Sequence, residues 1–180
     1  MVLTGNTYYQ GDSAITAMYQ GNVLVYSAAT TSTTTFYYVT TGDTIIPDTA
    51  FTGFVVISNT YSQGMGTLVV RGNVTYLGSA FEVKRNLEGI ILPDSILGIG
   101  FYRGGFYACV ELSSVTINSG VTEIEQDAFS GCNNLYELTY LGTKAQWNTI
   151  VKSNWWNDGA PNLYVVHCTD GNIPVYYPPE

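Results

Sequence analysis

Charged residues are scarce in this sequence, and basic ones are the scarcest. Only 11% of the residues are charged, with six Lys and Arg against fourteen Asp and Glu and a formal net charge of −8. Nucleic-acid binding takes its affinity from clustered Lys and Arg, and anionic membrane surfaces attract polybasic segments. Because the six basic residues are scattered, we expect neither a nucleic-acid partner nor a membrane-surface role.

Long apolar runs and a leader-like start are also lacking. No apolar stretch approaches the roughly 20 residues of a membrane-spanning helix. Residues 1–21, MVLTGNTYYQGDSAITAMYQG, have neither the basic start nor the apolar core of a secretory signal. We therefore expect no membrane insertion and no export by the general secretory route.

Three cysteines and one histidine leave little for metal or nucleophilic chemistry. The odd cysteine count argues against a disulfide framework, and His167 beside Cys168 falls short of the roughly four ligands of a zinc site. Glu123, Glu125 and Asp127 alternate along one segment, which suits a solvated strand edge better than a general acid and base. No set of nucleophile, base and orienting group can be assembled. We expect no catalytic residues, no metal, no cofactor and no enzyme activity.

What is abundant favours β structure. Apolar residues make up 46% of the chain and aromatic residues 14%, with Tyr the commonest aromatic at 15 copies. With so few charges, the surface must consist largely of Thr, Ser, Asn, Tyr and Gly. Thr and Tyr are enriched in strands, so the composition predicts a mainly β fold.

The N-terminal residues 1–29 are predicted to be a small β attachment unit. In AITAMYQGNVLVYSA, two apolar stretches flank Gln20-Gly21-Asn22, which is a hairpin signal. A lone hairpin is marginal in water, so this unit should pack on a partner. Its tyrosines are the candidate partner-binding residues: Tyr8, Tyr9, Tyr19 and Tyr26. The Thr-rich residues 30–36 that follow are interpreted as a linker.

A repeat appears from about residue 66 onward. Leu87, Leu112 and Leu135 begin segments that match position by position. The matching sets are Ile90, Val115 and Leu138; Leu92, Ile117 and Tyr140; Ile96 and Val121; Ile99 and Ile124; Phe106 and Phe129; and Cys109 and Cys132. A looser earlier copy places Leu68, Val70, Val74, Leu77 and Phe81 in the same positions.

Such a repeat predicts a solenoid. Stacked coils pair their short strands into a parallel sheet, and no copy buries its apolar side alone. Phe129 is expected to fill the centre of one coil, and Cys109 and Cys132 to stack as free thiols. We assign the solenoid to residues 37–141, degenerate before 66, and a C-terminal cap to residues 142–180.

Three tryptophans lie in the predicted cap. Exposed aromatic side chains stack on sugars and anchor protein interfaces, so Trp155 and Trp156 are candidate ligand contacts. However, a solenoid end also needs its last apolar face covered. For Trp147, Trp155 and Trp156 together, capping is the favoured role.

The segments LPDSILGIG, FYAC and LSSVTINSGVTEIEQDAFSGCNNL resemble the bacterial surface-antigen, or BspA-like, type of leucine-rich repeat. Its copies read roughly as I-P-x-x-V-x-x-I-G-x-x-A-F-x-x-C-x-x-L. The next segment, TYLGTKAQWNTIVKSNWWNDGAPNLYVVHCTDG, is similar to a terminal segment that closes such arrays. The resemblance covers about residues 66–171. It implies a short leucine-rich-repeat solenoid used for surface display, adhesion and contact with proteins or glycans, and it supplies no catalytic residues.

A second resemblance concerns the N-terminal unit. AITAMYQGNVLVYS looks like short β units at the N-termini of bacteriophage tail and head-appendage proteins. With the expected absence of a secretory signal, it favours a multicopy structural or attachment protein of a virion. Residues 1–29 would dock on other virion proteins, and the repeats would face a host surface protein or glycan. The alternative is a bacterial cell-surface or secreted adhesin or glycan-binding module.

Overall fold

The protein is mainly β and divides into two compact units, residues 1–33 and 34–180. The computed structural model describes residues 6–10, 13–20, 23–28, 32–48, 55–100, 104–158 and 160–175, the first three ranges by their backbone alone. Within these ranges, no helix has the length and apolar character needed to cross a membrane.

The first unit is a three-stranded antiparallel sheet of β1 (Asn6–Gln10), β2 (Ser13–Gln20) and β3 (Val23–Ala28). The predicted hairpin is β2 and β3, paired from Gln20↔Val23 to Ile15↔Ala28. Its Gly-Asn turn lies outside the described residues. β1 adds a strand that the hairpin signal alone did not predict.

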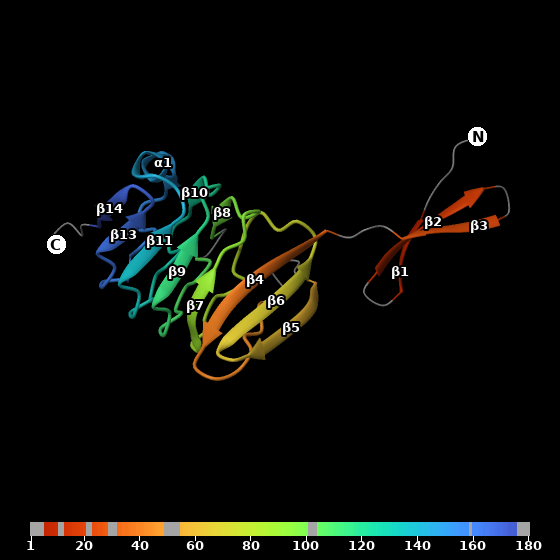
Figure 1. Cartoon of the computed structure of the whole chain (residues 1–180), viewed down its shortest axis with the longest axis horizontal. Helices are drawn as coiled ribbons and strands as arrows, with labels where there is room; N and C mark the ends of the chain where they lie inside the picture. The colour runs from red at the N-terminus through yellow and green to blue at the C-terminus, as the bar shows by residue number, and fades with distance from the viewer. Residues whose placement is uncertain are drawn as a thin grey trace. The chain divides into compact units, whose positions relative to one another are not determined.

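The second unit is built on an eight-stranded main sheet, ordered β14-β13-β11-β9-β7-β4-β6-β5 (Figure 1). Its strands are β4 (Thr33–Thr40), β5 (Val56–Ser62), β6 (Met65–Arg71), β7 (Leu87–Ile91), β9 (Ser114–Ile117), β11 (Glu137–Tyr140), β13 (Val165–Cys168) and β14 (Gly171–Pro174). A small second sheet contains β8 (Gly98–Ile99), β10 (Glu123–Ile124) and β12 (Val151–Lys152).

The predicted short leucine-rich-repeat solenoid is confirmed. β7, β9, β11 and β13 pair in parallel, and the register aligns equivalent residues of successive coils. One resulting column is Ile90, Val115, Leu138 and Val166, all buried. Leu87, Leu112 and Leu135 are fully buried in one core.

Aromatic rings stack through the middle of this core. Phe81, Phe106 and Phe129 stack with ring centroids 5.8 and 5.5 Å apart. Phe36 meets one end of the stack edge-on at 5.4 Å, and Trp156 meets the other at 6.0 Å. The predicted matching of Phe81, Phe106 and Phe129 therefore describes one physical column, with an aromatic residue closing each end.

The sequence interpretation of residues 30–36 as a linker differs from the structure at its C-terminal part. Residues 33–36 begin β4, which lies between β6 and β7 in the main sheet and runs antiparallel to β7. Thr34 is buried there, donating to the Gly72 carbonyl at 2.8 Å and accepting from the Val74 amide at 2.9 Å. A Thr-rich segment looks like a linker in sequence, but Thr also favours strands, and Phe36 supplies the buried anchor.

The C-terminal segment begins as one more coil before it closes the solenoid. β12 and β13 extend the two parallel ladders, and β14 then pairs antiparallel with β13. The helix α1 (Lys144–Thr149) is capped at its N-terminus by Thr143, whose hydroxyl accepts from the Gln146 amide in a capping box. Trp147 is buried, with its ring 5.3 Å from Tyr140 and 6.0 Å from Trp156.

Candidate functional site

The face of the main sheet turned away from the core carries the best candidate site. Side chains alternate along each strand, so the neighbours of buried residues point outward. Burial follows this rule along β4 and β9, where Tyr38 and Val115 are buried while Tyr37 and Ser114 are exposed. The outward positions of adjacent strands therefore form rows across the sheet.

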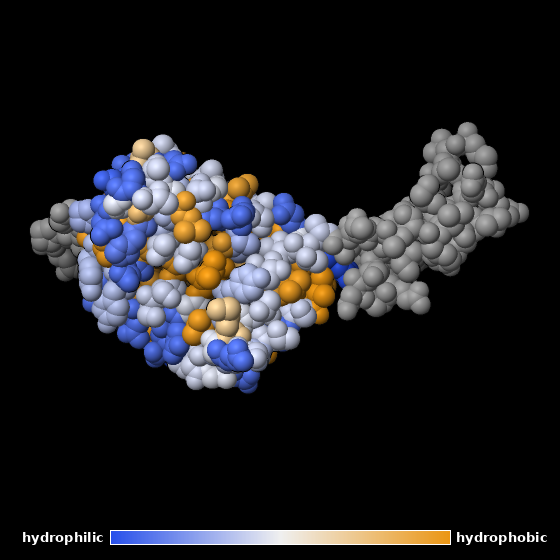
Figure 2. Space-filling view, viewed as in Figure 1, coloured by the Kyte–Doolittle hydropathy of each residue, from blue (hydrophilic) through white to orange (hydrophobic). Residues whose placement is uncertain are grey.

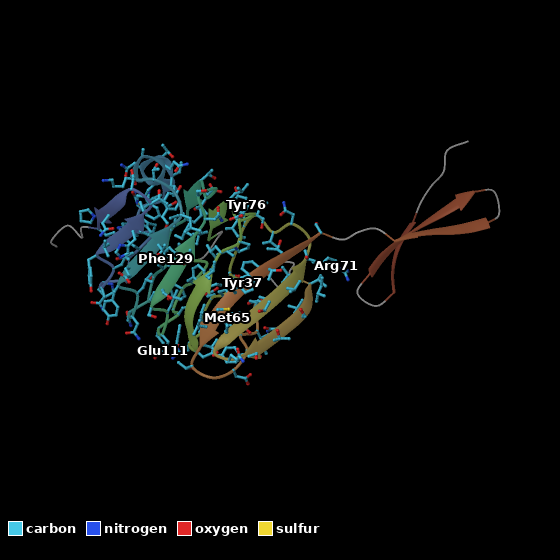
Figure 3. All side chains as sticks on the ribbon, in the orientation of Figure 1. Tyr37, Met65, Arg71, Tyr76, Glu111 and Phe129 are labelled. Carbon is cyan, nitrogen blue, oxygen red and sulfur yellow. The ribbon has the colours of Figure 1, made fainter. Side chains whose placement is uncertain are left out.

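Two such rows enclose a hollow of about 210 Å³. In one row Tyr37 lies opposite Ile91, which lies beside Thr116; in the other Val39 lies opposite Gly89, which lies beside Ser114. Met65 of β6 completes the lining, and Figure 3 shows Tyr37 and Met65 near one another on the main sheet.

Gly89 is the reason that the hollow exists. A Cβ atom built there would lie 2.6 Å from Ser114 Oγ and 3.8 Å from Val39 Cβ. A side chain of any size at this outward position would fill the space between the neighbouring strands. The glycine therefore leaves a floor of backbone between two walls of side chains.

The rim is apolar and accessible. Tyr37, Val39, Met65 and Ile91 are each between 37% and 50% exposed, and no lining residue is charged. Figure 2 shows apolar residues gathered over this part of the main sheet, among paler neutral ones. Ser114 and Thr116 place hydroxyl groups along one side. This arrangement is suited to holding an apolar group from a partner, with hydroxyls available to orient it.

The other end of the outward face is polar. His167 on β13 hydrogen-bonds through Nε2 to Glu137 Oε2 at 2.6 Å, and its Nδ1 lies 3.0 Å from Asn172 Oδ1. Because a carboxylate only accepts hydrogen bonds, Nε2 donates to Glu137. The hydrogen bond to Glu137 is the main cause that raises the pKa of His167 above its usual value.

The two buried cysteines have structural roles in this geometry. Cys109 and Cys132 are buried free thiols that donate to the Phe81 and Phe106 carbonyls at 2.9 and 3.1 Å. Burial raises the pKa of Cys109 to about 12 and also raises that of Cys132. Thiolate is the reactive form of cysteine, so neither thiol is activated as a nucleophile.

Two of the three carboxylates flagged in the sequence hydrogen-bond to neighbouring side chains. Glu125 accepts from the Ser153 hydroxyl at 3.3 Å, and Glu123 accepts from the Tyr76 hydroxyl. Asp127 has a left-handed backbone with φ of 58°. In the part of the chain that the structure describes, no group of three or more His, Cys, Asp or Glu could hold a metal ion.

The two candidate ligand contacts in the cap, Trp155 and Trp156, lie in different environments in the structure. Trp156 is partly buried against the core, at the end of the phenylalanine stack. Trp155 is 64% exposed and has a left-handed backbone with φ of 61°. Neither lines the hollow. Trp155 thus remains a prediction as a ligand contact, while Trp156 packs as a capping residue does.

The predicted partner-binding tyrosines belong to the first unit. Tyr8 and Tyr9 lie on β1, Tyr19 on β2 and Tyr26 on β3. Their side chains lie outside the described part of the structure, so partner binding by these residues stays a prediction.

The residues of the hollow do not stand out in the sequence. Tyr37 and Val39 alternate with buried residues along β4, which is the period-two pattern of a half-buried strand. That pattern was available in TTTFYYVT, but the flanking Thr residues concealed it. The floor at Gly89 could not be found in this way, because it depends on the neighbouring strands.

The family model of the BspA type leucine rich repeat region matches residues 44–154, with six copies. No curated protein and no solved structure matches the chain. The matched region covers more than half of the chain and contains β5 to β12, from the first hairpin of the main sheet to the last strand of the small one. The parallel ladders and the stacked phenylalanines are the physical form of those copies, and the chain belongs to the BspA-type leucine-rich-repeat family.

Proposed function

We propose that this protein is a non-enzymatic binding module that holds a partner protein in the hollow of its main sheet and attaches to a bacteriophage particle through residues 1–29. The family's repeat fold is typically a binding or structural module, which supports the general role. The single observation that carries the binding surface is the apolar rim around Gly89 on the outward side of the sheet.

The exposed rim supports binding because it costs free energy while it faces water. Clustered apolar side chains on a protein surface mark interaction sites more often than scattered ones do. Four large apolar residues lie together here, and a partner that covered them would remove that area from water. The sheet holds their backbones in a regular ladder, so the surface is formed before any partner arrives.

The shape of the hollow favours a protein partner. A volume of about 210 Å³ accommodates one large side chain, and buried anchors of this kind dominate protein interfaces. The uncharged lining and the excess of acidic residues in the chain favour a partner surface that is apolar at its centre and neutral or basic around it. A glycan is the other partner class. It could stack on Tyr37 and hydrogen-bond to the two hydroxyls, but its polar surface would make few favourable contacts with the apolar side chains of Met65, Val39 and Ile91.

The partner can be captured with a photo-crosslinker in place of Tyr37. We expect capture of a protein when Gly89 is intact, and loss of capture in Gly89→Val, because a branched side chain fills the floor. Gly42→Val is the matched control, since a Cβ there meets nothing within 4 Å. Equal capture from a crosslinker at the exposed Tyr107, or capture unchanged by Gly89→Val, would contradict the site. A glycan conjugate in place of a protein would also contradict it.

The bacteriophage assignment is supported by the sequence resemblance of residues 14–27. The alternative is a bacterial cell-surface or secreted adhesin. Mass spectrometry of purified particles, cell-surface fractions and culture supernatant distinguishes the two locations. We expect the protein in the particles, present in many copies. Its recovery from the cell surface or supernatant alone would replace the bacteriophage role with the adhesin role.

A further inference from the structure

The row of outward residues that contains Gly89 continues past the hollow across the main sheet. Gly89 of β7 lies beside Ser114 of β9, and Ser114 lies beside Glu137 of β11. Figure 1 shows β7, β9 and β11 side by side. Glu137 is exposed while Leu138 next to it is buried, so Glu137 points to the same side as the hollow. Neighbouring strands lie about 4.8 Å apart, which places Glu137 about 10 Å from the floor of the hollow.

Glu137 and His167 are the charged or titratable groups on this part of the face. The other outward residues of the described strands β9, β11, β13 and β14 are uncharged: Ser114, Thr116, Thr139, Val165, Asn172 and Pro174. The lining of the hollow carries no charge either. A molecule that lies across the face therefore meets apolar side chains first, then hydroxyl groups, then a carboxylate.

The carboxylate of Glu137 has room for a second partner. Its side chain is 57% exposed, and His167 Nε2 donates to one of its two oxygens, Oε2. In the described part of the chain, no other donor hydrogen-bonds to this carboxylate and no Lys or Arg forms an ion pair with it. Because both oxygens of a carboxylate accept hydrogen bonds, Oε1 is available to a donor from outside.

A basic group for Glu137 has to come from another molecule. Residues 1–33 contain no Lys, Arg or His, so the first unit has no basic side chain to offer. In the second unit, Lys152 donates to the Trp147 and Ile150 carbonyls, and none of the other described Lys or Arg residues pairs with Glu137. Complementary charge beside an apolar anchor fixes the orientation of a partner. Charge complementarity therefore points to a basic partner segment and away from the chain itself.

We propose that the partner segment that fills the hollow carries a Lys or Arg side chain about 10 Å from its apolar anchor, and that this side chain pairs with Glu137. This inference rests on the proposed function, because it extends the same site by one contact. The buried anchor supplies most of the affinity. The ion pair decides which way round the segment lies and which segments bind best.

His167 makes this contact sensitive to pH. While the ring is neutral, the pair of His167 and Glu137 keeps the negative charge of the carboxylate, and protonation of the ring cancels that charge. The described strands packed against His167 are β11 and β14, and Glu137 is the titratable outward side chain that they present. The hydrogen bonds to Glu137 and Asn172 raise the pKa of His167. Affinity for a basic segment should therefore fall as the pH decreases through that pKa.

A library of random peptides displayed on yeast tests the contact, with the full-length protein as bait. The wild type should enrich peptides that combine a large apolar residue with a Lys or Arg. Glu137→Gln should keep the apolar residue and lose the enrichment of Lys and Arg, whereas Gly89→Val should lose the apolar residue. Asp94→Asn is the matched control and should select the same peptides as the wild type, since it removes one charge from an exposed residue outside the strands.

One enriched peptide and its copy with Gln in place of the basic residue give the size of the contact by calorimetric titration. We expect the wild type to bind the Gln copy about two- to five-fold more weakly, which is the range of a solvent-exposed ion pair. Glu137→Gln should bind both peptides equally. In the wild type, the difference should shrink as the pH falls through the His167 pKa that NMR measures, and in His167→Gln it should stay constant over that range.

The outcomes separate this inference from the proposed function. Peptides enriched for the apolar residue alone, or an enrichment of Lys and Arg that survives Glu137→Gln, would overturn the inference and leave the proposed function in place. A difference between the two peptides that does not change with pH would overturn the role of His167. Failure of the wild type to enrich an apolar residue, or its persistence in Gly89→Val, would overturn both. Met65→Ser, at a rim position that is 50% exposed, replaces Gly89→Val if circular dichroism shows that variant to be unfolded.

Discussion

At the scale of single residues, Phe129 shows how one side chain holds several coils together. Its ring stacks on Phe106 at 5.5 Å and meets Trp156 edge-on at 6.0 Å, and it is fully buried. It therefore contacts the coil before it and the cap after it. Removing the ring leaves a cavity that neither neighbour can fill without breaking its own contacts.

We predict that Phe129→Ala lowers the free energy of unfolding by about 3–5 kcal/mol. Urea titration followed by tryptophan fluorescence measures the change, since Trp156 reports on the same contact. Tyr107→Ala is the control, because that ring is 41% exposed, and its loss should cost less than about 1 kcal/mol. A loss of similar small size for Phe129→Ala would contradict the central role of the stack.

At the scale of secondary-structure elements, the final strands are joined to the solenoid through their outward side chains as well as their backbones. β13 pairs in parallel with β11 and antiparallel with β14. His167 hydrogen-bonds to a side chain on each of these neighbours. The same ring therefore links three strands at the end of the main sheet. Its protonation state affects the stability of that end of the sheet.

This contact predicts a pH dependence. The pKa of His167 is raised above its usual value of 6.5 by the hydrogen bond to Glu137 and a second to Asn172. The folded protein therefore binds this proton more tightly than the unfolded chain does. The stabilisation is fully present below pH 6.5 and is lost as the pH rises through the folded-state pKa. Solvent screening keeps the effect small, because both side chains are in contact with solvent.

The titration of the His167 ring by NMR measures the pKa directly. Glu137→Gln should return it toward its usual value and flatten the pH dependence of the melting temperature over the same range. An unchanged pKa in that variant would show that Glu137 is not its cause. As the chain contains a single histidine, the signal is unambiguous.

At the scale of the whole molecule, the second unit, residues 34–180, has a hydrophobic core. We call it the repeat unit. Among the side chains that the structure describes, every residue of the buried cluster lies between Phe36 and Val166. β4 begins at Thr33 and the second unit at Thr34, so the structural boundary falls at the start of that strand. A truncation that extended past Thr40 would remove β4, which is an interior strand of the main sheet.

We predict that a chain beginning at residue 32 folds with the same cooperative unfolding transition as the full-length protein. Circular dichroism and urea titration measure this. A chain beginning at residue 41 is the contrasting case, because it lacks β4 and with it Phe36 and Tyr38, and we expect it to be strongly destabilised. Loss of the cooperative transition in the longer chain would show that the first unit is needed for the second to fold.

The sequence alone determined the repeat and its interior. Leu87, Leu112 and Leu135 recur at coil spacing because each coil must bury the same side against its neighbours, so burial leaves a periodic pattern that can be read without coordinates. The phenylalanine column and the stacked free thiols followed from that pattern, while the mainly β character followed from the composition.

Only the tertiary structure decided where β4 lies and where the hollow opens. The insertion of β4 between β6 and β7 joins segments far apart in the chain, and no periodic pattern encodes such a pairing. The hollow depends on it, since Gly89 forms a floor only because Val39 flanks it on one side and Ser114 on the other. An interior repeats because every coil has the same neighbours, whereas a binding surface arises where neighbours differ, and those differences exist only in the folded chain.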